Sequence, residues 1–188
     1  CAFVLIGINF NKYPNMWVED EYYYSSKVHQ RQKTDAEYAN DLKRFIENRP
    51  IKAIYIDPSA ASFKAELLKA GVDHLFDAEN EVIDGIRFVA KYLDLGTIKI
   101  CQKCTNLIKE FQSYVWDAKS LKSGIDKPLK ENDHALDALR YALYTHFFGK
   151  DTQRLTAQDI DRLYNETRSN GPNLPAFFQD QNELGYRF

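Results

Sequence analysis

The chain has 188 residues, of which 44% are hydrophobic and 28% charged, with three cysteines and a formal net charge of -2 at pH 7. This length suits one domain with a full core, and no apolar run approaches the roughly 20 residues that span a membrane. Three cysteines do not make a disulfide framework and suit a reducing compartment, so we expect a soluble intracellular protein. The net charge argues against binding of nucleic acid by bulk charge, although a local basic surface would leave the same total.

The first part of the chain predicts two strands followed by a helix. Residues 2–10 form an apolar run typical of a buried strand, residues 11–15 have turn composition, and strand-like composition resumes at Met16. Thr34 and Glu37 have the spacing of a capping box, so we expect a helix to begin there.

The middle of the chain alternates between strand and helix patterns. A short apolar strand ends at Asp57, a helix is expected over residues 62–70, and an amphipathic helix follows, with Gly96 as its stop signal. Residues 97–101 predict one more strand, and Thr105 is expected to cap the next helix, which extends to Val115. This βα order predicts an α/β domain.

The last predicted core helix lies in the segment KPLKENDHALDALRYAL, residues 127–143. Its buried stripe consists of apolar residues spaced three and four apart, namely Leu136, Leu139, Leu143 and Phe147. His134, Asp137 and Tyr141 fall on an adjacent stripe, so their side chains point the same way. Beyond Gly149 the pattern weakens, and we predict a domain over residues 1–149 with an irregular C-terminal tail over residues 150–188.

Two of these acids stand where a ligand site is common. Asp57 follows a buried strand, the edge at which α/β sheets collect ligands, although an acid that begins a turn is the plainer interpretation. Asp137 begins a helix, where a carboxylate also complements the helix dipole. Brought together, the two would supply hard oxygen ligands for Mg²⁺ or Mn²⁺.

His134 is harder to explain by helix stability alone. Asp133 or Asn132 can cap the helix, but a protonated imidazole near a helix N-terminus opposes the dipole. Its position favours a neighbouring anion, phosphate or metal.

These segments together resemble the C-terminal nuclease domain of the large terminase subunit of tailed bacteriophages. The similarity covers residues 2–147 and rests on AFVLIGIN, VEDEYYY, IKAIYIDPSAA and DKPLKENDHALDALRYAL. Its most specific part is the closing D-H-A-x-D-A-x-R-Y signature, together with the strand-end Asp57 about eighty residues earlier.

The resemblance implies an RNase H-like mixed sheet flanked by helices, and a metal-dependent endonuclease that cuts concatemeric double-stranded viral DNA during packaging. Asp57 and Asp137 would be catalytic, metal-binding acids in a site with two Mg²⁺ or Mn²⁺ ions, and His134 a further catalytic-site residue that supports the metal or a phosphate. Double-stranded DNA, the portal protein and the small terminase subunit are the implied partners. The ATPase motor would lie outside this chain, since no phosphate-binding loop of the G-x-x-x-x-G-K-[ST] type occurs here. No membrane contact is implied, and the expected location is the host cell cytoplasm.

The sequence departs from the family at one point. The first catalytic Asp of the family ends a strand just before the segment that matches AFVLIGIN, and this sequence holds no such residues. That strand is central in an RNase H-like sheet, so its loss would leave backbone groups of its neighbours unpaired. We therefore expect a first strand before residue 1.

Lys122, Lys127 and Lys130 lie in the polar segment before the last helix, where they either contact DNA phosphates or belong to a solvated loop. Two other functions stay open at the level of sequence. One is a non-catalytic RNase H-like module that binds DNA or docks on the portal, and the other is a nuclease similar to Holliday-junction resolvases.

Overall fold

The computed structural model describes residues 1–9, 15–117 and 127–148. Within these ranges the strands are β1 (Ala2–Asn9), β2 (Asn15–Tyr23), β3 (Ile54–Ile56), β4 (Leu75–Asp77) and β5 (Ile98–Ile100). The helices of the same ranges are α1 (Ser26–His29), α2 (Asp35–Phe45), α3 (Ala61–Lys69), α4 (Val82–Asp94), α5 (Thr105–Ser113) and α7 (His134–Phe148). None of them is both long and apolar enough to cross a membrane. The predicted tail at residues 150–188 lies outside the described residues.

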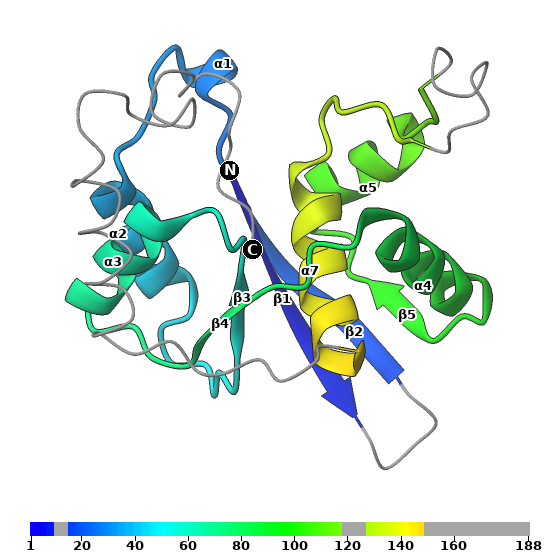
Figure 1. Ribbon diagram of the computed structural model, residues 1–188, viewed down its shortest axis with the longest axis horizontal. Coiled ribbons are helices and arrows are strands. Elements are labelled where there is room, and N and C mark those ends of the chain that lie inside the picture. The colour runs from blue at the N-terminus through cyan, green and yellow to red at the C-terminus, as the bar shows by residue number, and fades with distance from the viewer. Residues whose placement is uncertain (10–14, 118–126, 149–188) are drawn as a thin grey trace.

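The strands form two separate groups. β1 pairs antiparallel with β2, from Ala2 opposite Tyr23 to Asn9 opposite Asn15, and β2 pairs in parallel with β5. β3 and β4 form a second, parallel pair, with Ile56 opposite Asp77. The predicted mixed α/β architecture is confirmed, with helices beside both groups (Figure 1).

Successive residues of β1 enter two different cores, because side chains alternate between the faces of a strand. Phe3 packs in a cluster with residues of α2, α3, β3 and β4. Ala2 packs in the other cluster, with residues of α4, α5, α7 and β5. In Figure 1, accordingly, α2 and α3 lie on one side of β1, and α4, α5 and α7 lie on the other.

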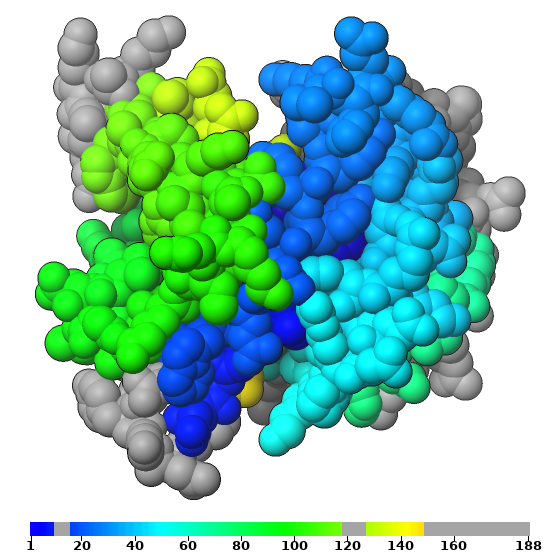
Figure 2. Space-filling model, turned by 180° about the vertical axis from the view of Figure 1, so that it is seen from behind, coloured from blue at the N-terminus to red at the C-terminus, as the bar shows by residue number. Residues whose placement is uncertain are grey.

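A groove of about 330 Å³ lies between β1 and β3. Its lining is mostly apolar and includes Phe3 to Ile8 of β1, Ile51 to Tyr55 at β3, and Leu143 of α7. In the described part of the chain, β1 pairs only with β2 and β3 only with β4, so each has one edge without a strand neighbour. Figure 2 shows the dark blue residues of β1 and the cyan residues that precede and form β3 on opposite sides of a hollow.

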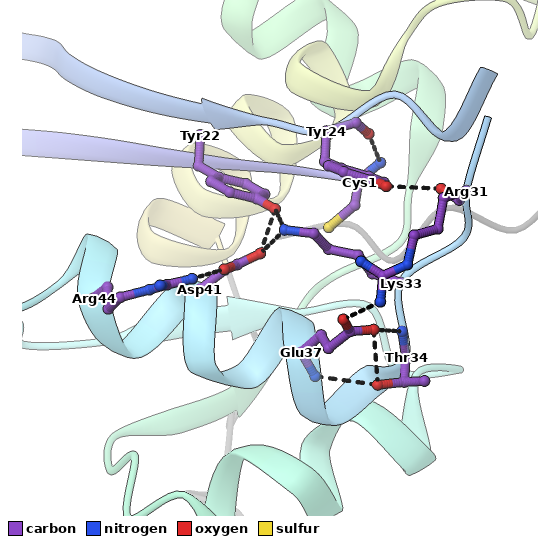
Figure 3. Close-up of polar contacts among 9 residues, drawn as sticks. All are labelled: Cys1, Tyr22, Tyr24, Arg31, Lys33, Thr34, Glu37, Asp41 and Arg44. Carbon is purple, nitrogen blue, oxygen red and sulfur yellow. Dashed lines mark hydrogen bonds and ion pairs between the residues drawn. The ribbon is translucent and has the colours of Figure 1, made fainter. Parts of the chain in front are cut away.

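The start of α2 is the clearest case of local sequence deciding local structure. The side chain of Thr34 accepts from the N–H of Glu37, and the Glu37 carboxylate accepts from the N–H of Thr34, which confirms the predicted capping box (Figure 3). One turn later Asp41, which is 6% exposed, accepts from the Tyr22 hydroxyl at 2.6 Å and is paired with Lys33 and Arg44. These bonds tie α2 to β2.

The predicted start and end of α5 are wrong. Thr105 is the first helical residue, and its neighbour Cys104 at the N-cap position makes no side-chain capping bond. The Glu21 carboxylate of β2 instead accepts from the N–H groups of Asn106 and Leu107, at 2.7 and 2.9 Å. The helix ends at Ser113, and Val115 is 55% exposed rather than part of a buried stripe. A distant side chain thus replaces the local cap.

Candidate active site

Asp57 directly follows β3 and is held by its own turn. The Ser59 backbone N–H and hydroxyl both donate to Oδ1 of Asp57, at 2.9 and 2.6 Å. Such a bond to the backbone two residues on is the reason that Asp is favoured in turns. The carboxylate is only half-buried, so it stays accessible to a ligand.

Tyr141 connects this carboxylate to α7. Its hydroxyl donates to Oδ2 of Asp57 at 2.9 Å and lies 3.0 Å from the side-chain oxygen of Asn80, which follows β4. The side chain of Tyr141 is 2% exposed. Burial, and then the negative charge of Asp57, raise the pKa of the Tyr141 phenol far above its usual value. The phenol therefore keeps its proton and remains a donor to Asp57.

Asp137 lies on the same stripe of α7, one turn before Tyr141. It is 4% exposed, and its Oδ1 accepts from Nε and Nη2 of Arg140, at 3.2 and 3.1 Å. Arg140 is equally buried, and its Nη1 donates to the carbonyl of Glu81 at 3.4 Å. A buried carboxylate is tolerated here because a buried cation neutralises it.

Gly85 of α4 makes room for that cation. A Cβ placed on Gly85 would lie 2.7 Å from Cγ of Arg140 and 2.8 Å from its Cδ, closer than real Cβ contacts allow. The close packing of α4 on α7 thus holds the Arg140 side chain over Asp137.

The structure links Asp57 to α7 through Tyr141, one turn after Asp137 on the same helix. Tyr141 bonds directly to Asp57, and residues four apart on a helix are neighbours, with Cβ atoms about 5–6 Å apart. His134, the first residue of α7, lies toward β2, where its ring centroid is 6.3 Å from that of Tyr23.

Glu110 of α5 is a buried acid that the sequence did not single out. Its Oε2 accepts from the N–H groups of Ala135 and Leu136 at 2.8 and 2.9 Å, and its Oε1 accepts from the Tyr23 hydroxyl at 2.9 Å. Burial raises the pKa of the Glu110 carboxyl to about 7, against the opposing effect of these hydrogen bonds. Glu110 therefore caps α7 from another helix. In the sequence, only its position three residues after Leu107 indicated that its side chain is buried.

Two of the three candidate DNA-binding lysines are within the described residues. Lys127 and Lys130 are both exposed, and the carbonyl of Lys127 accepts from the N–H of Asp117 at 2.8 Å. This bond, with the bridge between Trp116 and Pro128, joins two antiparallel segments. Lys122 lies outside the described residues.

The donor set suits a hard divalent cation but is incomplete. Carboxylate oxygens are the ligands that Mg²⁺ and Mn²⁺ prefer, and Asp57 and Asp137 could supply two of them. Among the described residues, no group of three or more His, Cys, Asp or Glu side chains is placed to hold a metal.

A family model described as the terminase RNase H-like domain matches residues 14–145. The chain belongs to this family. The large terminase subunit of Escherichia phage T5 is 30% identical over 134 residues, which cover 70% of this chain and 31% of that protein. The predicted resemblance to the nuclease domain of large terminases is therefore confirmed.

Solved terminase structures agree with the fold of this terminase domain. The large terminase of a thermophilic bacteriophage has a TM-score of 0.72 at 42% identity, over 79% of this chain and 36% of that chain. The large terminase nuclease domain of bacteriophage SPP1, solved with bound Mn, has a TM-score of 0.56 at 21% identity, over 77% of this chain and 78% of that one. The chain spans about a third of the length of the T5 protein and of the thermophilic phage protein.

Proposed function

We propose that this terminase domain is a metal-dependent endonuclease that cuts concatemeric double-stranded viral DNA during genome packaging. The observation that carries the proposal is the bond from Tyr141 of α7 to Asp57, with Asp137 one turn earlier on the same helix, in a member of the terminase RNase H-like family. Carboxylates on a strand end and a helix start are suited to hold divalent ions against a phosphodiester.

Asp57 and Asp137 would bind Mg²⁺ or Mn²⁺ in a two-metal site, and His134 would support the metal or a phosphate. The Mn bound to the SPP1 nuclease domain supports this choice of ion. When bound, such ions lower the pKa of a water molecule and neutralise charge on the phosphate. The chain itself supplies the fixed carboxylates and, through buried Arg140, a cation that balances Asp137 before any metal binds.

The groove between β1 and β3 supports the expectation of a further strand. Within the described ranges each bordering strand has one edge without a strand neighbour, beside an apolar groove, and buried backbone groups need hydrogen-bond partners. A strand that leads into β1 through a short turn would run antiparallel to β1 and join the two strand groups into one sheet. We propose that this strand carries the third acid.

Lys122, Lys127 and Lys130 would contact the phosphates of double-stranded DNA, and Lys127 and Lys130 are exposed on the surface, where a duplex can reach them. The portal protein, the small terminase subunit and an ATPase motor domain outside this chain are the further proposed partners. The thermophilic phage terminase was also solved in complex with ATP-gamma-S, which supports a motor elsewhere in the longer protein. The proposed location is the host cell cytoplasm.

Nicking of supercoiled plasmid tests the proposal. A chain that carries the proposed first strand should nick plasmid in Mn²⁺ and not in EDTA, and Asp57→Asn and Asp137→Asn should each abolish nicking. Full activity of either variant, or equal activity in EDTA, would contradict the assignment of the acids.

A non-catalytic module is the second candidate. It is favoured by the absence, among the described residues, of a third metal ligand beside Asp57 and Asp137. Duplex binding that does not change between Mn²⁺ and EDTA, with no nicking in either, would establish this function instead.

A further inference from the structure

The hydroxyl of Tyr141 lies between two polar side chains of different elements. It is 2.9 Å from Oδ2 of Asp57 and 3.0 Å from the side-chain amide of Asn80. A phenol carries a single hydrogen, so it can donate to only one of these neighbours at a time. An ionised carboxylate can only accept, so the hydrogen belongs on the bond to Asp57.

Asn80 must then offer its amide N–H₂ to the phenol oxygen. The oxygen and nitrogen of an Asn side chain are assigned from the hydrogen bonds that they make, and in this orientation the phenol oxygen both donates and accepts. The result is a directed chain of hydrogen bonds, from Asn80 to Tyr141 to Asp57. Consecutive bonds of this kind strengthen one another.

The segment that carries Asn80 is itself attached to α7 on both sides. The N–H of Glu79 donates to Oγ1 of Thr145 at 2.9 Å, and the carbonyl of Glu81 accepts from Arg140 at 3.4 Å. Thr145 is 3% exposed, so the first of these bonds lies within the folded core. Asn80 is exposed but stands on a backbone that α7 holds in place.

Both oxygens of Asp57 are thereby oriented by different parts of the fold. Ser59, in the same turn, directs Oδ1, whereas Tyr141 directs Oδ2 and belongs to the helix that also carries Asp137. Among the bonds described, the one from Tyr141 connects the carboxylate of Asp57 to the helix of Asp137.

We propose that Tyr141 is a positioning residue of the metal site, anchored by Asn80, that fixes Asp57 in the orientation in which it binds the metal together with Asp137. The inference rests on the proposed function. Hydrogen-bond partners of metal-binding side chains typically account for 10–100-fold in metal affinity or activity.

The test is Tyr141→Phe in a chain that carries the first strand. The change removes one hydroxyl and keeps the buried ring. We expect the dissociation constant for Mn²⁺, measured by calorimetry, to rise about 10-fold or more. The Mn²⁺ concentration for half-maximal nicking should rise equally, while the rate at saturating Mn²⁺ recovers to near that of the unaltered protein.

Tyr24→Phe is the matched control. Tyr24 is 8% exposed and also loses one hydroxyl hydrogen bond, to the carbonyl of Arg31 at 2.8 Å, far along the chain from Asp57. Its Mn²⁺ affinity should not change. A Tyr141→Phe protein with the Mn²⁺ affinity of the control would overturn the positioning role while leaving the proposed nuclease intact.

Asn80→Ala gives a second test, at an exposed position that does not threaten folding. Alone it should weaken Mn²⁺ binding less than Tyr141→Phe does. Added to Tyr141→Phe, it should raise the dissociation constant for Mn²⁺ by less than about a further 2-fold, because Asn80 acts through the hydroxyl that Tyr141→Phe has already removed. If the two substitutions instead weaken Mn²⁺ binding by factors that multiply, Asn80 does not act through Tyr141 and the proposed chain of hydrogen bonds is wrong. Unaltered protein that neither binds Mn²⁺ nor nicks DNA would instead refute the proposed function.

Discussion

Asp57 and Asp137 have opposite surroundings, although both are proposed to bind the same metals. Asp57 is half-buried and bonded to neutral groups of Ser59 and Tyr141. Asp137 is 4% exposed and paired with the equally buried guanidinium of Arg140. Removing the carboxylate charge should therefore lower the free energy of unfolding at Asp137 but change it little at Asp57.

We predict that Asp137→Asn lowers the free energy of unfolding by about 1.5–3 kcal/mol, the usual contribution of a hydrogen bond to a charged group. Asp57→Asn should change it by less than about 1 kcal/mol, because an amide can still accept from Ser59 or Tyr141. Urea denaturation without divalent metal measures both. Equal free energies of unfolding for the two variants would mean that burial of the Arg140 guanidinium does not require the charge of Asp137.

Glu110 should make stability depend on pH. Its pKa rises from an ordinary 4.5 to about 7 in the folded chain, so between these values the folded chain holds a proton that the unfolded chain has lost. The free energy of unfolding should therefore fall as pH rises from about 4.5 to 7, by up to about 3 kcal/mol. Urea denaturation at several pH values measures the decrease.

Glu110→Gln is the control for this effect. The amide oxygen can still accept from the N–H groups of Ala135 and Leu136, and its N–H₂ can donate to Tyr23. The variant has no proton to gain, so the difference between the two stability profiles isolates Glu110. A difference that does not change with pH would contradict the raised pKa.

At the scale of elements, the antiparallel segments before α7 are the candidate DNA contact. If Lys122, Lys127 and Lys130 bind phosphates, replacing all three with Ala should reduce the dependence of log binding constant on log salt by about 0.9 per lost contact. Titration of labelled duplex at several salt concentrations measures this slope. Mn²⁺ affinity should stay equal or rise, since the variant has lost three positive charges.

The matched control replaces exposed lysines of α2, α3 and α4, namely Lys43, Lys69 and Lys91. The net charge then changes by the same amount on other surfaces. If both triple variants reduce the salt slope equally, DNA is attracted by overall charge and the proposed contact is wrong.

At the scale of the whole molecule, the groove separates two groups of strands that both contact α7. We predict that a chain with the proposed strand before Cys1 shows slower amide hydrogen exchange in β1 and β3 than the chain that begins at Cys1, and a higher melting temperature. Both follow from pairing the exposed edges and burying the apolar groove. Hydrogen exchange followed by mass spectrometry measures the difference.

The β2–β5 pair provides the internal reference, because Met16 and Cys101 already donate across it at 2.9 and 3.0 Å, to Thr97 and Val18. Exchange there should change least. Unchanged exchange in β1 and β3 would show that the added strand does not enter the groove.

The sequence by itself determined the parts of this protein that depend on near neighbours. The capping box of Thr34 and Glu37 spans three residues, and the stripe of Asp137 and Tyr141 spans four, so helix geometry alone predicts them. The signature around Asp137, together with the strand-end Asp57, indicated the family, which the match over residues 14–145 confirms.

Only the tertiary structure decided which distant groups meet. Glu110 caps a helix 25 residues later, and Tyr141 reaches Asp57 across 84 residues. The Glu21 carboxylate, 85 residues before Asn106, likewise took the place of the local cap predicted at Thr105. Periodicity assigns a residue to a face but not to a partner, because the partner depends on how whole elements pack. For the same reason the sequence indicated both candidate acids and placed Tyr141 on the stripe of Asp137, but it did not show that Tyr141 bonds to Asp57 or that Arg140 and Gly85 pack beside Asp137.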